Sequence, residues 1–280
     1  EMQAYTDFIL TVVYPPNPVR NLNDTLTTSQ SAGQTVLTTG SRDANQPCTF
    51  CHVLPLGTDG LSSFEGEPQE FKIAHLRNAY QKIGMFGVPA GASVPQTGPF
   101  GDQVRAFGFL HDGSVPSVFD FLQASVFNLN NTQRRDAEAF ILAFDTGLRP
   151  SVGQQVSATS TTFNDSTVTT RINDLIARDE ANDCDLVVKG NLANVARGWL
   201  YDDVTNLFAS DRASEGEIAE ATLRAQAGTV GQELTYTCVP PGNGTRIGLD
   251  RDEDGFRDRT ELDAGSDPAN PASIPGGTTT

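Results

Sequence analysis

The chain contains the segment Cys48-Thr49-Phe50-Cys51-His52, which carries its most specific chemical signal. Two thiols separated by two residues can add to the two vinyl groups of one haem, and a histidine directly after them is then held beneath the iron. A redox-active Cys-x-x-Cys pair and half of a zinc site are the alternatives, but the sequence offers the surrounding context of neither. The pattern predicts one haem c, attached to Cys48 and Cys51, with His52 as the proximal ligand.

The sixth coordination position of the iron has several candidates. Met85 is flanked by glycines that let the backbone approach a porphyrin, and a thioether is a common axial ligand in electron carriers. The only other methionine is Met2, so the alternatives are His111, His75 or an open position. The sequence therefore favours Met85 and leaves the other candidates open.

The remaining two cysteines, Cys184 and Cys238, stand alone in the sequence. An even number of cysteines favours a disulfide over two buried thiols, and the bridge is expected to tie the first and last strands of the C-terminal part. Disulfide formation and covalent haem attachment both belong to an oxidising compartment. We therefore expect a periplasmic or extracellular protein.

Changes in composition divide the chain into four parts. Residues 1–24 are interpreted as an N-terminal helix and linker, and the helix is either the end of a preceding, related haem domain or a simple amphipathic helix. Residues 25–150 are the expected c-type haem domain. Residues 151–248 are expected to form a small, disulfide-tied α+β domain, and residues 249–280 a calcium-binding loop with a disordered tail.

Hydrophobic periodicity gives the expected elements inside these parts. In the haem domain, helices are predicted through about 28–39 and within 133–150, and a helix between them should turn Val118, Leu122 and Val126 inward. For the following domain, the same patterns predict helices at 168–176 and 218–225 and strands at 185–188, 199–201, 207–208 and 234–238.

An acidic segment near the end of the chain matches the twelve-residue calcium-loop pattern. Gly255 takes the sharp turn at position six, and oxygen ligands fall at positions one, three, five, seven, nine and twelve. Its six carboxylates repel one another unless a cation is present, and a solvated acidic linker is the alternative. The predicted Ca²⁺ ligands are Asp250, Asp252, Asp254, the carbonyl of Phe256, Asp258 and Glu261.

Three segments follow the haem motif in order: His75-Leu76-Arg77-Asn78, Phe109-Leu110-His111-Asp112-Gly113-Ser114 and the helix around Phe140. Over about 25–150 the chain thereby resembles the C-terminal haem domain of the bacterial di-haem cytochrome c peroxidase family, which includes the methylamine-utilisation haem enzymes. The resemblance implies a bacterial protein with a mainly α, class-I-like cytochrome c fold, and it implies that Arg77 lies near a haem propionate.

This chain departs from that family in two respects. It has one haem attachment motif, whereas the family peroxidases need two haems. In addition, about 30 residues separate the Leu-Arg-Asn and His-Asp-Gly segments, which often lie close together in the family. Peroxidase activity of this chain alone is therefore doubtful, and the question of an enzymatic activity stays open.

Residues 265–271 follow the acidic loop and resemble the thrombospondin type 3 class of extracellular calcium repeats, not a helix-flanked EF-hand. The resemblance implies a further calcium ligand from Asp267 and a structural role for the ion, which would order the tail against the α+β domain. Extracellular modules of this kind bind Ca²⁺ with dissociation constants of roughly 10⁻⁴–10⁻³ M.

The chain has 280 residues, with 19 basic and 35 acidic side chains, and its formal net charge is −16. This balance disfavours nucleic acid, which is bound through Lys and Arg, and favours basic partners. The longest apolar run, Phe8 to Tyr14, is far too short to span a membrane.

Together these features predict an exported c-type cytochrome that carries electrons to a basic redox partner or to another cytochrome. One alternative is the haem domain of a di-haem peroxidase-like oxidoreductase. The other is a haem-bearing subunit of a homo-oligomer or of a larger extracellular assembly or filament.

Overall fold

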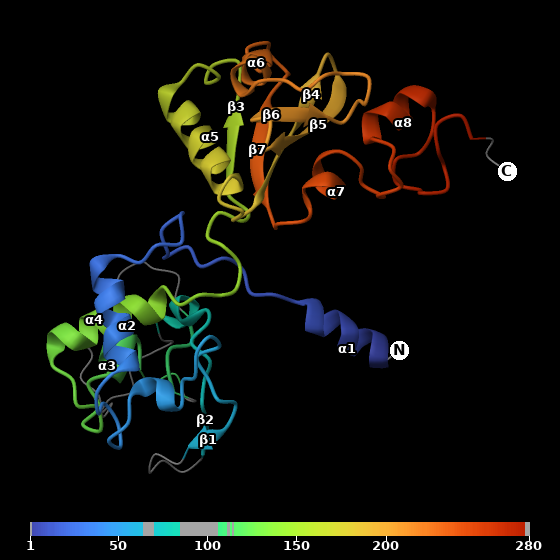
Figure 1. Ribbon diagram of the computed structural model, residues 1–280. Helices are drawn as coiled ribbons and strands as arrows, with labels where there is room; N and C mark the ends of the chain where they lie inside the picture. The colour runs from blue at the N-terminus through green and yellow to red at the C-terminus, as the bar shows by residue number, and fades with distance from the viewer. Residues whose placement is uncertain (1, 64–69, 85–105, 111–112, 114, 278–280) are drawn as a thin grey trace. The chain divides into compact units, whose positions relative to one another are not determined.

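The computed structural model describes residues 2–63, 70–84, 106–110, 113 and 115–277 (Figure 1). The chain divides into two compact units, Glu1–Pro150 and Ser151–Thr280. Two of the predicted axial ligands, Met85 and His111, lie outside the described residues.

In its described residues, the first unit consists of short helices and two very short strands joined by loops. Its elements are α1 (Met2–Thr11), α2 (Thr28–Thr38), the 3-10 helix η1 (Cys48–Phe50), β1 (Ser62–Ser63), β2 (Phe71–Lys72), the 3-10 helix η2 (Ala79–Lys82), α3 (Val118–Phe121) and α4 (Asn131–Leu142). Strands β1 and β2 pair antiparallel.

Helices α2 and α4 pack against each other and provide most of the core of the first unit. A capping box fixes the start of α2, because Thr27 and Gln30 each accept the other's backbone amide proton, and α4 starts with an equivalent box. Gly33 allows the two backbones to approach closely, since a Cβ there would lie 1.9 Å from the carbonyl oxygen of Asp136. The predicted helices in these two regions are confirmed.

The predicted helix between them is much shorter than expected. The side chain of Ser117 caps α3, which ends after a single turn. Val118 and Leu122 are buried as predicted, but Val126 is 56 % exposed, because the chain has already passed into turns at this position.

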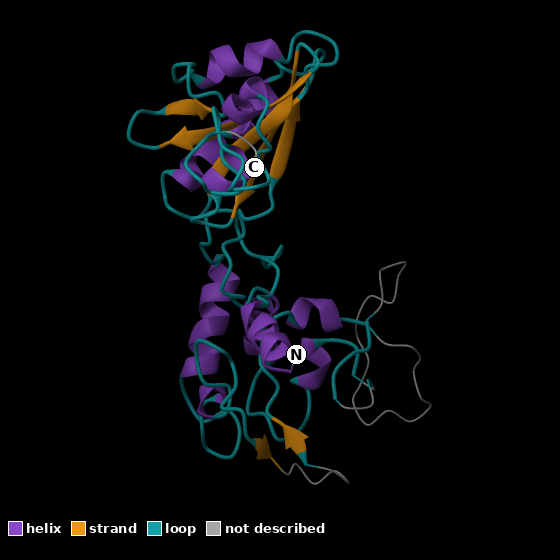
Figure 2. Cartoon of the chain, turned by 90° about the vertical axis from the view of Figure 1, so that its right-hand side faces the viewer, coloured by secondary structure: helices purple, strands orange, loops and turns teal. Residues whose placement is uncertain are grey.

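The second unit is built on a five-stranded antiparallel sheet (Figure 2). Its elements are β3 (Gln155–Ala158), α5 (Ser166–Asp179), β4 (Asp185–Leu192), β5 (Val195–Asp202), β6 (Leu207–Ser210), α6 (Glu220–Gln226), β7 (Leu234–Val239), α7 (Gly244–Gly248) and α8 (Asp258–Ala264). The strand order in the sheet is β3-β7-β4-β5-β6.

Strand register gathers large apolar side chains on one face of this sheet. Val188 lies opposite both Tyr236 and Trp199, and Tyr201 lies opposite Phe208; all five are buried. Helix α5 packs against β3, β7 and β4 (Figure 1). The alternation of Leu234, Tyr236 and Cys238, which predicted β7, thus corresponds to buried positions in the structure.

The predicted mainly α, class-I-like cytochrome c fold is wrong. Helix makes up 31 % of the structure and strand 16 %, and the largest element of regular structure is the antiparallel sheet. The prediction took the fold of residues 25–150 from a resemblance carried by a few short segments, and it assigned a small, disulfide-tied α+β domain with a calcium-binding loop to the rest of the chain. In the structure, the haem motif is surrounded largely by loops, and the second unit derives its core from paired strands.

A disulfide joins Cys184 and Cys238 in the second unit, with their Cα atoms 5.4 Å apart. Cys184 directly precedes β4 and Cys238 lies in β7, which is the neighbour of β4 in the sheet. The expectation that the bridge ties the first and last strands is wrong for the first strand, because β3 precedes β4 and was not predicted. The bridge therefore reinforces two strands in the interior of the sheet.

Candidate haem and metal sites

The haem motif is organised by one tight turn. The backbone amide of His52 donates to the carbonyl oxygen of Cys48 at 2.9 Å, so the turn that begins with η1 continues to the histidine. Cys48 and Cys51 are half-buried and form no disulfide, and Cys48 packs against the apolar core. Burial raises the pKa of the Cys48 thiol. Two thiols and one imidazole thus leave the same turn, which is the arrangement that attachment of one haem requires.

The imidazole of His52 is held in one tautomer. Its Nδ1 lies 2.9 Å from the carbonyl oxygen of Gly57. A carbonyl oxygen can only accept, so Nδ1 carries a proton, and in the neutral ring Nε2 then has the lone pair. Metal-bound histidines are commonly oriented by such a hydrogen bond from the second ring nitrogen. This hydrogen bond orients the ring of His52 and leaves Nε2 available to bind a metal.

Apolar side chains near the motif are exposed. Phe50 lies within the motif and is 62 % exposed, and Val53, Leu54 and Leu56 follow it and are also exposed. A local group of exposed apolar side chains often marks a ligand or partner site. The composition of this group fits the apolar face of a porphyrin.

A second polar group lies in the segment that resembles the peroxidase family. Three buried atoms have no hydrogen-bond partner there: Nδ1 of His75, Nε of Arg77 and Oδ1 of Asn78. Burial, followed by the positive charges of Lys82 and Arg77, lowers the pKa of His75. Unpartnered buried polar atoms call for a missing partner, and donors beside a guanidinium favour an anion. The two nitrogens can donate to a carboxylate such as a haem propionate, whereas Oδ1 of Asn78 can only accept and needs a donor.

The two groups belong to adjoining segments. A Cβ atom on Gly57 would lie 2.9 Å from the backbone nitrogen of Leu76, so the turn that orients His52 touches the chain between His75 and Arg77. The hydroxyl of Tyr14 also contacts this segment and lies 2.9 Å from Nε2 of His75. The contribution of Tyr14 was not predicted, because nothing in its sequence surroundings signals a contact over 61 residues.

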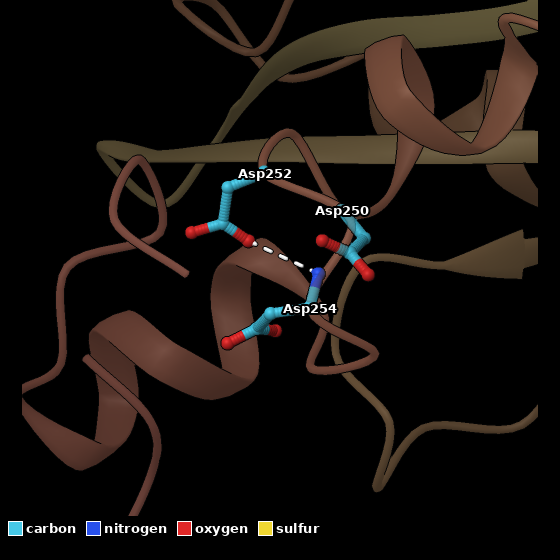
Figure 3. Close-up of side chains that lie close together, drawn as sticks. All are labelled: Asp250, Asp252 and Asp254. Atoms are coloured by element: carbon cyan, nitrogen blue, oxygen red, sulfur yellow. Dashed lines mark hydrogen bonds between the residues drawn. The ribbon is translucent and has the colours of Figure 1, made fainter. Parts of the chain in front are cut away.

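Three of the predicted calcium ligands come together in one loop of the second unit (Figure 3). One carboxylate oxygen from each of Asp250, Asp252 and Asp254 lies within 4.8 Å of the other two, a spacing that one cation can bridge. The two oxygens of Asp250 accept from the amides of Glu253 and Gly255. These backbone bonds hold the carboxylate of Asp250 in the turn.

Glu261, at position twelve of the loop, lies in α8 and is fully buried. Neither of its carboxylate oxygens has a hydrogen-bond partner, and the same is true of one oxygen each of Asp252 and Asp254. Burial, followed by the negative charges of Asp254 and Asp252, raises the pKa of Glu261. A buried carboxylate without a donor beside further carboxylates is costly unless a cation accompanies it.

The remaining predicted ligands are placed differently. Asp258 accepts from the backbone amide of Arg251 at 2.9 Å and from its Nε at 3.0 Å, so its carboxylate is already paired. Asp267 accepts from the amide of Ala269 within its own turn. The amide of Phe256 donates to Asp254, which fixes the backbone at position seven. The competing role of Arg251 was missed, because a calcium-loop pattern gives no weight to the residue at position two.

The flanks of the loop also differ from the expectation. The short helix α7 ends just before Asp250, and α8 begins at Asp258. The loop is therefore flanked by helices on both sides, whereas the sequence was interpreted as departing from a helix-flanked arrangement.

Comparisons with protein-family models, with curated proteins and with solved structures find no match for this chain. Any assignment of function therefore depends on its own residues and their geometry. Within the described part of the chain, no helix combines the length and the apolar character of a membrane span.

Proposed function

We propose that this protein is an exported c-type haem protein that transfers electrons. The observation that carries the proposal is the hydrogen bond from Nδ1 of His52 to Gly57, made by a histidine that directly follows the two-thiol motif. The bond leaves Nε2 available to iron, and the motif supplies the two thiols for attachment. When bound, the haem supplies a one-electron Fe(III)/Fe(II) couple.

In this proposal the chain's own residues hold and orient the haem. Cys48 and Cys51 anchor it covalently, and the 2.9 Å bond to Gly57 fixes the plane of the His52 ring. The buried Nε of Arg77 and Nδ1 of His75 are available to donate to a propionate. Met85 is proposed as the sixth ligand, with His111 and His75 as the alternatives.

The charge of the chain supports a carrier role. A net charge of −16 attracts basic proteins over long distances and speeds their encounter, so a basic redox partner or a cytochrome with a basic face fits best. Electron transfer needs no general acid, general base or substrate pocket. We propose a periplasmic or extracellular location, because both haem attachment and the Cys184–Cys238 disulfide suit an oxidising compartment.

The test is a visible spectrum of the full chain, produced in a host that exports and matures c-type cytochromes. We expect about one haem per chain, retained on a denaturing gel, with a low-spin spectrum in both oxidation states. The weak long-wavelength band of methionine ligation would support Met85, and its absence would favour a histidine.

Two results would contradict the proposal. A folded chain that is exported through the same host without retaining haem would exclude a c-type haem protein. A high-spin haem whose spectrum changes with hydrogen peroxide would exclude a simple carrier and favour the peroxidase-like alternative. A double variant, Cys48→Ser with Cys51→Ser, serves as the control for covalent attachment.

A further inference from the structure

We propose that the loop between α7 and α8 binds one Ca²⁺ ion through a specific set of five residues and that this ion holds α8 against the sheet. The proposed ligands are the carboxylates of Asp250, Asp252, Asp254 and Glu261 and the carbonyl oxygen of Phe256. Asp258 and Asp267, which the sequence pattern also offered, are outside this set.

The carboxylates of the loop alone would not establish a site, since exposed acidic groups are common. The decisive residue is Glu261, which lies in α8 and is fully buried, with both oxygens unpartnered. Glu261 holds position twelve of the calcium-loop pattern, which supplies a bidentate carboxylate to the same ion as positions one, three and five. The unpartnered oxygens of Asp252 and Asp254 complete a set of acceptors that lacks a positive partner.

The chemistry of this set favours calcium. All of the ligands are oxygens, and they include four carboxylates and a backbone carbonyl, as hard cations require. A set of this size suits the adaptable, larger coordination sphere of Ca²⁺ better than the rigid octahedron of Mg²⁺, which usually keeps several waters.

The exclusion of Asp258 follows from its contacts. Both of its oxygens accept from Arg251, and its own amide donates to the carbonyl of Leu249 at 2.8 Å. These bonds close the loop from its two ends without an ion. Asp258 therefore acts as a structural link of the loop and leaves the ion to the other carboxylates.

The hydrogen bonds of α8 connect the proposed site to the sheet. The amide of Arg259 donates to the carbonyl of Asp211 at 3.0 Å, and the hydroxyl of Thr260 accepts from the amide of Ala213 at 2.8 Å. Asp211 in turn accepts from Arg197 of β5 at 2.8 Å. An ion that joins the loop to Glu261 would hold these contacts in place, so its binding should stabilise the second unit.

The experiment compares Glu261→Gln with Glu253→Gln in the full chain, each freed of metal by a chelator. Glu253 belongs to the same loop and carries the same charge, but its side chain is exposed and outside the proposed set. Calcium binding is measured by calorimetry, and thermal unfolding is followed with CaCl₂ and, as a control for charge screening, with MgCl₂ at equal ionic strength.

We expect wild-type protein and Glu253→Gln to bind about one Ca²⁺ per chain and to unfold at a higher temperature with calcium. Glu261→Gln should bind at least about tenfold more weakly, since it loses a charged, bidentate ligand. With calcium, wild type should unfold at a higher temperature than Glu261→Gln. Without metal, Glu261→Gln should unfold at a higher temperature than wild type, because it lacks the buried, unpartnered charge. This reversal distinguishes a ligand from a residue that only supports the fold.

Three outcomes would overturn the proposal. They are no calcium binding at millimolar concentration, an equal rise of the unfolding temperature with magnesium, and equal effects of the two Gln variants on calcium affinity.

A third variant tests the ligand set. Asp258→Ala should unfold at a lower temperature than wild type with and without calcium, but calcium should still raise its unfolding temperature. If calcium no longer raises the unfolding temperature of this variant, Asp258 is a calcium ligand.

Discussion

The hydroxyl oxygen of Tyr14 lies 2.9 Å from Nε2 of His75, and the two rings are tilted by 46° with their centroids 5.1 Å apart. This contact joins the chain that follows α1 to the segment before η2. Because Nε2 is already engaged, His75 is poorly placed to bind iron as the sixth ligand while the contact is intact. Its second nitrogen, Nδ1, is the buried atom without a partner.

We therefore predict that His75→Gln and Tyr14→Phe keep a low-spin haem spectrum. Both variants should instead shift the reduction potential, because a donor is lost or reoriented next to the proposed propionate site. Optical spectra and a redox titration measure the two effects separately. His52→Gln is the control and should lose the proximal ligand. A high-spin spectrum for His75→Gln alone would instead identify His75 as an iron ligand.

A second prediction concerns Gly57, whose carbonyl orients His52, the proposed proximal ligand. Its φ is +73°, and a Cβ atom there would lie 2.9 Å from Cβ, Cγ and the nitrogen of Leu76. Gly57→Ala must therefore shift the turn away from the core and with it the acceptor for His52. We expect a loss of about 2–4 kcal/mol in stability and an altered reduction potential or haem content.

Gly60 provides a matched control for this variant. It has a similar φ of +77°, but a Cβ atom there would meet nothing within 4 Å. Gly60→Ala should therefore show the backbone strain alone, about 1 kcal/mol, with an unchanged haem spectrum and potential. Equal behaviour of the two alanine variants would show that the contact between Gly57 and Leu76 does not position His52.

Elements with a local sequence signal could be predicted, and elements defined by distant pairing could not. The start of α2 could be predicted because Thr27 and Gln30 form a local capping box, and β7 because its buried residues alternate. Strand β3 was missed: its four residues are mostly exposed or half-buried, and it is defined only by pairing with a strand almost 80 residues later in the chain. Such pairing leaves no local trace in the sequence.

The candidate sites divide in the same way. The two-thiol motif and the acidic loop have fixed spacings that follow from the geometry of one ligand, so candidate residues could be proposed from the sequence. The partners that orient them could not. The hydrogen bond between His52 and Gly57 depends on the conformation of one turn. From the sequence alone, Asp258 can be either a calcium ligand or the hydrogen-bond partner of Arg251. Only the three-dimensional arrangement decides between such alternatives.

A third prediction separates the two kinds of cysteine. The disulfide between Cys184 and Cys238 closes a loop with a sequence separation of 54, so its removal should destabilise the second unit by about 4 kcal/mol in the chain-entropy picture. The double variant Cys184→Ala with Cys238→Ala should unfold at lower urea, monitored by Trp199, yet retain covalent haem. Loss of haem from this variant would show that haem attachment depends on the second unit.

The last prediction concerns Asp179 at the end of α5. Burial, together with the charges of Asp185 and Asp203, raises its pKa from 3.8 to about 6. The folded state then binds more protons than the unfolded state between about pH 4 and 6, so stability falls as the pH rises through this window and stays lower above it.

Asp179→Asn removes this charge and can still accept from the amide of Leu186, the present partner of the carboxylate. We expect the variant to be more stable than wild type by about 1–2 kcal/mol at pH 7.5, with the difference vanishing near pH 4. Asp174→Asn, an exposed change in the same helix, is the control and should have little effect at either pH. Urea unfolding at a series of pH values measures these differences. A gain of equal size at pH 4 and 7.5 would mean that it does not come from the ionisation of Asp179.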